Sequence, residues 1–232
     1  MQYPRLLDGF SNLTHVIFVI SLKRSLERRA KVSEILQDVN FEFFDAIDGK
    51  ALTSDQSAMV EKYIIPDTLK NPGQIGCFLS HVNLWKLIKN KKLQYCLVME
   101  DDIVKKTAES FEDILEIPKL EKIQGFDIIY IGHCYEKKAE DLQKVESNSM
   151  LTIYKSDNPL CTHAYIISQA GVIKLLDYME SRRFDMPIDM VMSQAIKDKS
   201  ITCYSVYPTL VDQDNIVPSI ISDGLSHPWF KA

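Results

Sequence analysis

The stretch Leu97-Val98-Met99-Glu100-Asp101-Asp102 closes a short apolar run, residues 95–99, with three consecutive carboxylates. An uninterrupted apolar run of this length indicates a strand buried on both faces, as in a parallel sheet. In open α/β sheets, ligands bind beyond the carboxyl ends of the strands. The stretch therefore predicts an α/β fold in which a central strand delivers acidic side chains to a ligand-binding edge.

The three carboxylates repel one another, and folding alone gives no reason to place them side by side. A divalent cation gives one, because Mg²⁺ and Mn²⁺ take oxygen ligands and can bridge carboxylates to the phosphates of a ligand. Alternate residues of an extended segment point the same way, so Glu100 and Asp102 can share one face. Asp101 then points elsewhere, toward a ribose hydroxyl or a backbone amide. The alternative is a solvated acidic turn.

Strands and helices alternate around this stretch, as β-α-β units require. From β-branched content and apolar periodicity, strands are predicted at 16–21, 41–46, 126–132, 151–154, 164–168 and 201–206. Helices are predicted at 22–38, 54–63, 74–89, 108–117, 169–180 and 187–197. Ser21 is a candidate cap for the first helix. Residues 136–148 are expected to form an exposed loop, and the chain from residue 207 onward is expected to be irregular.

Composition favours a soluble globular protein with one domain over residues 1–232 and a core at about 14–222. The chain has 232 residues, of which 46% are hydrophobic and 25% charged, and its net charge is -5. This charge argues against a nucleic-acid partner, which usually requires a basic excess. No signal peptide and no membrane span are recognisable, so a cytoplasmic protein is expected.

Five cysteines are widely spaced, and none belongs to a C-x-x-C pair. They are Cys77, Cys96, Cys134, Cys161 and Cys203. Most lie in apolar segments, so we expect buried, reduced thiols. The pair His133-Cys134 and the triplet Cys161-Thr162-His163 fit no common zinc spacing, and zinc is not expected.

Two nucleotide-binding motifs are missing from the sequence. No G-x-G-x-x-G follows the first strand and no G-x-x-x-x-G-K-[ST] occurs, which disfavours a dinucleotide-binding Rossmann site and a P-loop. A metal held by carboxylates beside a nucleotide diphosphate is the remaining hypothesis.

The string 73–81 (GQIGCFLSH), followed by Asn83, Trp85 and Lys86, resembles glycosyltransferase family 25, as does the acidic stretch at 97–102. Further segments agree in the same order: 20–24 with Arg28 and Arg29, 45–50, 126–132, 164–168 with Gly171, and 187–189. The resemblance covers residues 16 to about 222. The family includes animal procollagen galactosyltransferases, which are the closer match, and bacterial lipooligosaccharide galactosyltransferases.

The resemblance implies a GT-A-type fold, with a Rossmann-like mixed central sheet flanked by helices. It also implies a UDP-sugar donor, dependence on Mn²⁺ or Mg²⁺, and inversion at the anomeric carbon. In such folds the acidic motif holds the metal against the donor's diphosphate, which makes Glu100 and Asp102 metal ligands, Asp102 foremost. The motif is E-D-D rather than D-x-D, so the number of ligands stays open. Gln213 or Asp214 is a candidate further ligand, with an exposed acidic loop as the alternative.

The donor site is expected at the end of the first strand. Ser21, Leu22 and Arg24 would meet uracil and ribose, and Arg24 or Arg29 could pair with phosphate because guanidinium matches phosphate geometry. Arg28 is expected on a solvated helix face. Asp48 either accepts from uracil or ribose, or stabilises an Asp-Gly turn.

The family string also places Ser80, His81 and Asn83 near the donor, and Asp101, facing away from Glu100 and Asp102, is a further donor-binding candidate. An inverting transferase needs a base that deprotonates the acceptor hydroxyl. Asp189 is the candidate; its alternative role is a favourable charge at a helix N-terminus. His163, expected in a loop before the strand 164–168, is an alternative base or a contact to the sugar.

The sequence thus predicts a metal-dependent inverting transferase that moves galactose or glucose from UDP to a hydroxyl. The acceptor partner would be hydroxylysine in a collagen-like peptide, or a sugar on lipooligosaccharide if the chain is a stand-alone bacterial or viral enzyme. Two other hypotheses are a transferase-like binding protein that has lost catalysis and a Mg²⁺-dependent nucleotide hydrolase.

Overall fold

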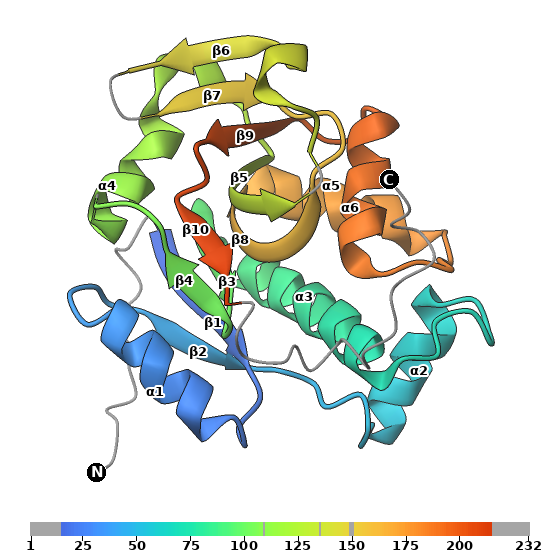
Figure 1. Cartoon of the computed structure of the whole chain (residues 1–232). Helices are drawn as coiled ribbons and strands as arrows, with labels where there is room; N and C mark the ends of the chain where they lie inside the picture. The colour runs from blue at the N-terminus through green and yellow to red at the C-terminus, as the bar shows by residue number, and fades with distance from the viewer. Residues whose placement is uncertain (1–14, 109, 135, 149–150, 215–232) are drawn as a thin grey trace.

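A computed structural model describes residues 15–108, 110–134, 136–148 and 151–214, and an eight-stranded mixed sheet forms its centre (Figure 1). The strand order is β2-β1-β3-β8-β5-β9-β7-β6. The strands are β1 His15–Ser21, β2 Glu42–Asp45, β3 Tyr95–Glu100, β4 Ile103–Lys105, β5 Ile128–Cys134, β6 Lys144–Ser147, β7 Thr152–Lys155, β8 Leu160–Ser168, β9 Cys203–Tyr207 and β10 Val211–Gln213. The helices are α1 Leu26–Ile35, α2 Ser54–Tyr63, α3 Pro72–Lys91, α4 Phe111–Glu116, α5 Gln169–Glu180 and α6 Ile188–Lys197.

Both faces of the sheet are covered, which explains why its central strands are continuously apolar. Side chains of a strand alternate between the two faces. In β1, Phe18 packs into a core with α2, α3, α5 and α6, whereas Val19 packs into a second core with α1 and α4. The predicted fold class, an α/β fold with a mixed central sheet flanked by helices, is confirmed.

Strand directions bring several chain segments to one edge of the sheet. β1 is parallel to β2 and β3, with Ser21 opposite Asp45 and Ile20 opposite Glu100. β8 is antiparallel to β3 and β5, so the start of β8 and the end of β5 reach the same edge. The expected delivery of the acidic stretch to a sheet edge is therefore confirmed.

A separate two-stranded antiparallel ribbon lies beside this edge. It pairs β4, which directly follows the acidic stretch, with β10, and Gln213 is opposite Ile103 (Figure 1). The prediction of an irregular chain after residue 207 is wrong at β10, because three residues acquire a strand partner that lies about a hundred positions earlier.

Other differences from the predicted elements also reflect long-range pairing. The segment 136–148 contains β6, which pairs with β7, so it is not simply an exposed loop. His163 lies within β8 rather than in a loop before it, because β8 begins at Leu160. α1 begins at Leu26, with Ser25 at its N-cap position, so Ser21 does not cap the helix.

The expectation that all five cysteines are reduced is wrong for two of them. Cys134 at the end of β5 and Cys161 near the start of β8 form a disulfide. They are 27 positions apart in sequence, but the antiparallel pairing of β5 and β8 brings their Cα atoms to 5.6 Å. Cys77, Cys96 and Cys203 are free thiols, as predicted.

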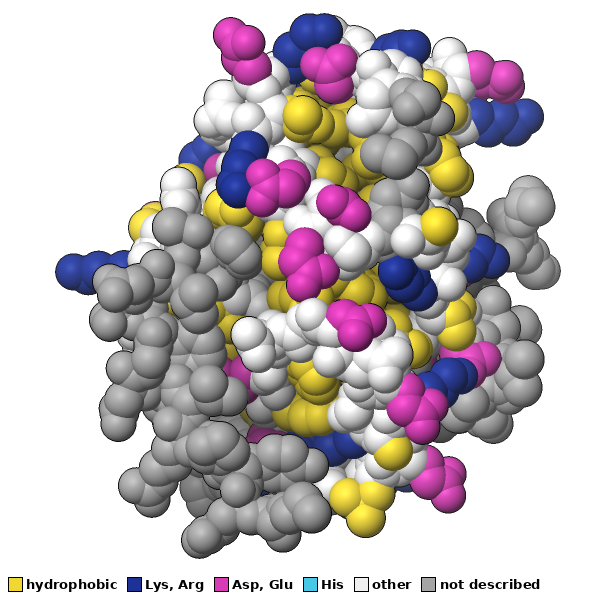
Figure 2. Space-filling model, turned by 90° about the vertical axis from the view of Figure 1, so that its left-hand side faces the viewer, with side chains coloured by type: hydrophobic (Ala, Val, Ile, Leu, Met, Phe, Trp, Pro, Cys, Tyr) yellow, Lys and Arg dark blue, Asp and Glu magenta, His cyan; other side chains and the backbone are white. Residues whose placement is uncertain are grey.

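Within the described ranges, no helix combines the length and the apolar character that crossing a bilayer requires. Figure 2 shows acidic and basic side chains interspersed on the face that it presents, with apolar side chains between them. The single-domain assignment to 1–232 stays a prediction, since its ends, 1–14 and 215–232, lie outside the described residues.

Candidate active site at the end of β3

A pocket opens at the carboxyl end of β3, between β1, α1, the loop after β2 and the first half of α3. It is an open hollow of about 670 Å³, a volume that includes open solvent. Its polar and charged lining residues are Arg24, Arg28, Asp48, Lys50, Cys77, Ser80, His81, Glu100, Asp101 and Asp102. The three carboxylates thus face one cavity.

Asp101 is the best-neutralised of the three carboxylates. It accepts hydrogen bonds from Ser21 Oγ at 2.7 Å and from Arg28 Nη1 at 2.8 Å. The expectation that Arg28 lies on a solvated helix face is wrong, because its side chain is only 14% exposed and faces Asp101. Asp101 therefore ties the end of β3 to β1 and α1.

Glu100 is held from the opposite side. Its Oε1 accepts from Thr162 Oγ1 at 2.5 Å and lies 3.3 Å from His81 Nε2. Burial raises the pKa of Glu100, but the contacts with His81 and Thr162 outweigh it and lower the pKa below its ordinary value. The Tyr165 hydroxyl, 2.8 Å from His81 Nδ1, fixes the imidazole in turn.

Asp102 is the least stabilised of the three carboxylates. It is nearly buried, and its Oδ1 has no hydrogen-bond partner among the described residues. Burial, followed by the charge on Glu100, raises the pKa of Asp102 to about 7, although Arg28 at 3.8 Å and the Gln213 side chain act in the opposite direction. A buried carboxylate of this kind fits a bound cation, which would supply the missing charge.

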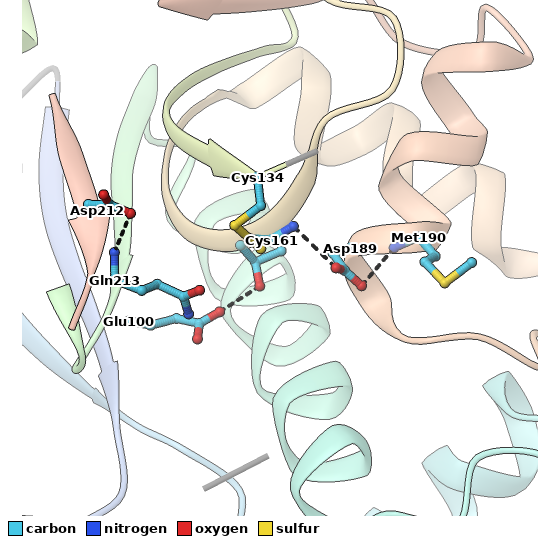
Figure 3. The surroundings of a disulfide bond; sticks show 8 residues. Glu100, Cys134, Cys161, Asp189, Met190, Asp212 and Gln213 are labelled. Carbon is cyan, nitrogen blue, oxygen red and sulfur yellow. Dashed lines mark hydrogen bonds between the residues drawn. A yellow bond between two sulfur atoms is a disulfide. The ribbon is translucent and has the colours of Figure 1, made fainter. Parts of the chain in front are cut away.

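The ribbon of β4 and β10 brings the predicted C-terminal ligands to the same place. The Gln213 side chain hydrogen-bonds Asp102, and Figure 3 shows it extending toward Glu100. The Asp214 amide donates to the Asp102 carbonyl at 2.6 Å, whereas the Asp214 carboxylate pairs with Lys31. Glu100, Asp102 and Gln213 are thus the residues that could hold a metal, and Asp214 is already engaged by a lysine.

The predicted donor residues divide into two groups. Leu22 lines the pocket, and Arg24 and Asp48 form an ion pair at its rim that lowers the pKa of Asp48. Arg29 is not a lining residue. It donates to the Ser21 carbonyl and to Asp45, each at 2.8 Å, and stacks on Phe43.

The residues predicted on α3 also fall into two groups. Ser80 and His81 are fully buried and line the pocket, whereas Asn83 does not line it. Ser80 Oγ accepts from the Ile47 amide at 2.8 Å and donates to the Gly76 carbonyl at 2.6 Å. A Cβ on Gly76 would lie 2.5 Å from the Ile47 carbonyl oxygen, so only glycine permits this close approach of α3 to the loop after β2.

The two candidate bases lie beyond Glu100, outside the residues that line the pocket. Asp189 Oδ2 accepts from the Cys161 amide at 3.1 Å, and Oδ1 accepts from the Met190 amide at 2.9 Å (Figure 3). Burial raises the pKa of Asp189, and the hydrogen bonds from these two backbone amides reduce that rise. His163 is fully buried, and burial lowers its pKa; among the described residues, neither of its ring nitrogens has a hydrogen-bond partner of regular geometry.

Two functional candidates escaped the sequence-based prediction. Thr162 contacts Glu100, and Cys77 lies with His81 and Glu100 in a group whose ligand atoms are within 4.8 Å of one another. The only sequence signals were the position of Cys77 inside the 73–81 string and that of Thr162 between Cys161 and His163. Neither signal reveals that both side chains face Glu100.

Comparisons with known proteins identify the family of the chain. The family described as "Glycosyltransferase family 25 (LPS biosynthesis protein)" matches residues 14–192. The chain belongs to glycosyltransferase family 25.

Two relatives show how far the similarity extends. A "Glycosyltransferase 25 family member" of Drosophila melanogaster is 26% identical over 90% of this chain and 38% of its own length. "Procollagen galactosyltransferase 2" of Homo sapiens is 30% identical over 69% of this chain and 27% of its own length. The chain thus spans about a third of the length of these relatives.

Among solved structures, a mannose-1-phosphate geranyltransferase from Thermus thermophilus covers 84% of this chain, and 74% of its own chain is covered. Its TM-score is 0.42 at 10% identity, a likeness that supports no functional inference.

Proposed function

We propose that the chain is a metal-dependent, inverting glycosyltransferase that moves galactose or glucose from a UDP-sugar to an acceptor hydroxyl. The observation that carries the proposal is the under-neutralised carboxylate of Asp102 beside Glu100, facing the pocket at the end of β3. Family membership supports a nucleotide-sugar donor. A divalent cation, Mn²⁺ or Mg²⁺, would neutralise charge on the UDP leaving group as the glycosidic bond breaks.

In this proposal the residues around the pocket bind the donor. Glu100, Asp102 and Gln213 would hold the metal, while Asp101 is occupied by Ser21 and Arg28 and keeps the end of β3 in place. Leu22, Arg24 and Asp48 line the part of the pocket next to β1, where the nucleoside would lie. Ser80 and His81 support the floor of the pocket from α3.

Asp189 is proposed to accept the proton of the acceptor hydroxyl. Its raised pKa brings it closer to neutral pH than an ordinary carboxylate, which favours a general base. His163 is the alternative base, and its lowered pKa keeps the ring neutral and able to accept a proton. The acceptor is proposed to be hydroxylysine in a collagen-like peptide, by analogy with the procollagen-modifying relatives, or a sugar of a lipooligosaccharide.

The test is a UDP-release assay. UDP-galactose and UDP-glucose are each supplied with Mn²⁺, Mg²⁺ or Zn²⁺, and with a hydroxylysine peptide or a sugar acceptor. We expect release that needs both an acceptor and Mn²⁺ or Mg²⁺, and thermal stabilisation by the preferred donor through mass action. Zinc is included because Cys77 and His81 offer softer ligands beside Glu100.

Two outcomes would contradict the proposal. If no UDP-sugar binds even with excess metal, the chain is a binding protein rather than a transferase. UDP release that no acceptor accelerates would instead identify a nucleotide hydrolase.

A further inference from the structure

The disulfide between Cys134 and Cys161 lies at the same edge of the sheet as the acidic stretch (Figure 3). It joins the last residue of β5 to the second residue of β8. Cys161 has φ of +66°, in the left-handed region that a residue with a Cβ rarely adopts. Its surroundings therefore hold this backbone in place, and the covalent link to β5 is the strongest of those constraints.

Two successive residues of this backbone contact the candidate site from one side. The Cys161 amide donates to Asp189 Oδ2 at 3.1 Å, and the Thr162 hydroxyl donates to Glu100 Oε1 at 2.5 Å. The two carboxylates come from different elements, the start of α6 and the end of β3. A shift of residues 161–162 would disturb both of them at once.

We propose that the disulfide and Thr162 form a positioning clamp that sets the orientation of Glu100 and Asp189. The clamp is defined as Cys134, Cys161 and Thr162. This inference rests on the proposed function, because it assigns the clamp to the metal and base residues of that site. None of the three residues needs to touch a substrate, so they are positioning residues.

The clamp is also open to reduction. A dithiol reductant transfers two electrons and two protons to the disulfide, so the sulfur–sulfur bond breaks, two thiols form, and the dithiol becomes a cyclic disulfide. Residues 161–162 then lose their covalent link to β5, and the strand pairs on either side of them, at Leu160 and Ala164, together with their own hydrogen bonds, are left to hold them. We therefore expect the reduced protein to turn over more slowly than the oxidised protein.

The first experiment removes one contact while the disulfide stays intact. Thr162→Val deletes the hydroxyl with little change in volume, and Thr162→Ser restores a hydroxyl. Thr152→Val is the matched control, since Thr152 makes a similar hydrogen bond to Ser147 on the exposed β6–β7 hairpin. Mn²⁺ binding is measured by electron paramagnetic resonance and turnover by UDP release.

Loss of a supporting contact to a metal ligand typically costs about 10–100-fold in metal affinity or activity. We expect Thr162→Val to show a loss in this range, Thr162→Ser to recover most of it, and Thr152→Val to behave like the wild type. Wild-type Mn²⁺ affinity and turnover in Thr162→Val would overturn the proposal.

The second experiment compares the wild type with Cys134→Ser/Cys161→Ser, with and without the dithiol. We expect the dithiol to lower the wild-type kcat, reoxidation to restore it, and the double variant to be slow and insensitive. A reduced wild type that keeps its kcat overturns the redox part. Should the double variant not fold, the Thr162 series still decides, because it leaves the disulfide unchanged. An oxidised wild type without any UDP release contradicts the proposed function instead.

Discussion

At the carboxyl end of β3, negative charge is stabilised by different groups on the two sides of the strand. On the β1 side, Asp101 is paired with Arg28 and hydrogen-bonded to Ser21, and Asp45 is paired with Arg29. On the β8 side, Glu100 and Asp189 are contacted by a hydroxyl, an imidazole and backbone amides. The β1 side is neutralised by the protein itself, whereas the β8 side is stabilised by dipoles and a weakly basic group.

This difference suggests what each side is for. Neutralised carboxylates fix the end of the strand, and they have little to gain from a metal. Carboxylates held by dipoles keep their charge available for a cation that arrives with a ligand. Asp102 lies at the boundary, 3.8 Å from Arg28 but with Oδ1 unpartnered among the described residues.

A substitution of Asp102 gives the strongest test of this comparison between the two sides. Asp102→Asn keeps the shape of the side chain but removes its negative charge. A catalytic metal stabilises the transition state by several kcal/mol, and each step of about 1.36 kcal/mol corresponds to a tenfold change in rate. We expect UDP release to fall on the order of 1,000-fold at saturating metal and donor. Near-normal turnover would mean that the acidic end does not hold the metal.

Asp189 tests the far end of the β8 side. Asp189→Asn removes the proposed base, whose contribution is typically about 100-fold or more. We expect kcat to fall by about 100-fold while donor-induced thermal stabilisation is unchanged. Asp185→Asn, an exposed neighbour before α6, is the control and should keep wild-type turnover. A wild-type kcat in Asp189→Asn would transfer the base role to His163.

The pH dependence of stability sharpens the comparison further. Asp102 has a pKa of about 7 in the folded protein, well above its value of 3.8 in a model compound. The folded state therefore holds this proton more tightly, so the stabilisation is complete below pH 4 and is lost as the pH rises through 7. Between pH 5 and 7 the metal-free protein should lose about 2 kcal/mol from this group.

Urea unfolding of the metal-free protein at several pH values measures this loss. Asp102→Asn should remove that component and be at least as stable as the wild type at pH 8. Mn²⁺ should stabilise the wild type at pH 8 but not the variant. An identical pH profile for the two proteins would show that Asp102 titrates normally.

Substitutions of two arginines test the β1 side, and we expect them to have the smallest effect, a change in the free energy of unfolding. Arg28→Met should lower the free energy of unfolding by about 1.5 kcal/mol, because Asp101 loses a charged partner in a nearly buried place. Arg24→Met removes an exposed ion pair and should cost less than about 0.5 kcal/mol. Equal losses in the two variants would contradict the distinction between anchored and exposed pairs.

Local signals predicted the elements best. The predicted helices 54–63 and 169–180 coincide with α2 and α5. In the structure a cap marks the start of each helix: Thr53 with Gln56 in a capping box, and Ser168 bonded to the Gly171 amide. The strand 16–21 and the acidic strand end were also predicted, because fully buried strands are continuously apolar.

Features that depend on distant partners were not predicted. The disulfide, β6, β10 and the burial of Arg28 each require knowledge of what lies opposite in space. Glu100, Asp102, Ser80, His81 and Gln213 were assigned to one site by family resemblance, and the structure places them together. Helical periodicity gives the face on which Arg28 lies, but it cannot name Asp101 as its counter-ion.

The pairing of β10 with β4 has a consequence for biosynthesis. A ribosome makes the chain from its N-terminus, so all of the sheet strands emerge before Gln213 can reach Asp102. A nascent chain that has emerged only as far as residue 207 contains all eight strands of the central sheet but lacks β10, and therefore lacks the ribbon that completes the acidic corner. Ligand affinity would thus be gained only once β10 has emerged, after the strands of the central sheet have become available for pairing.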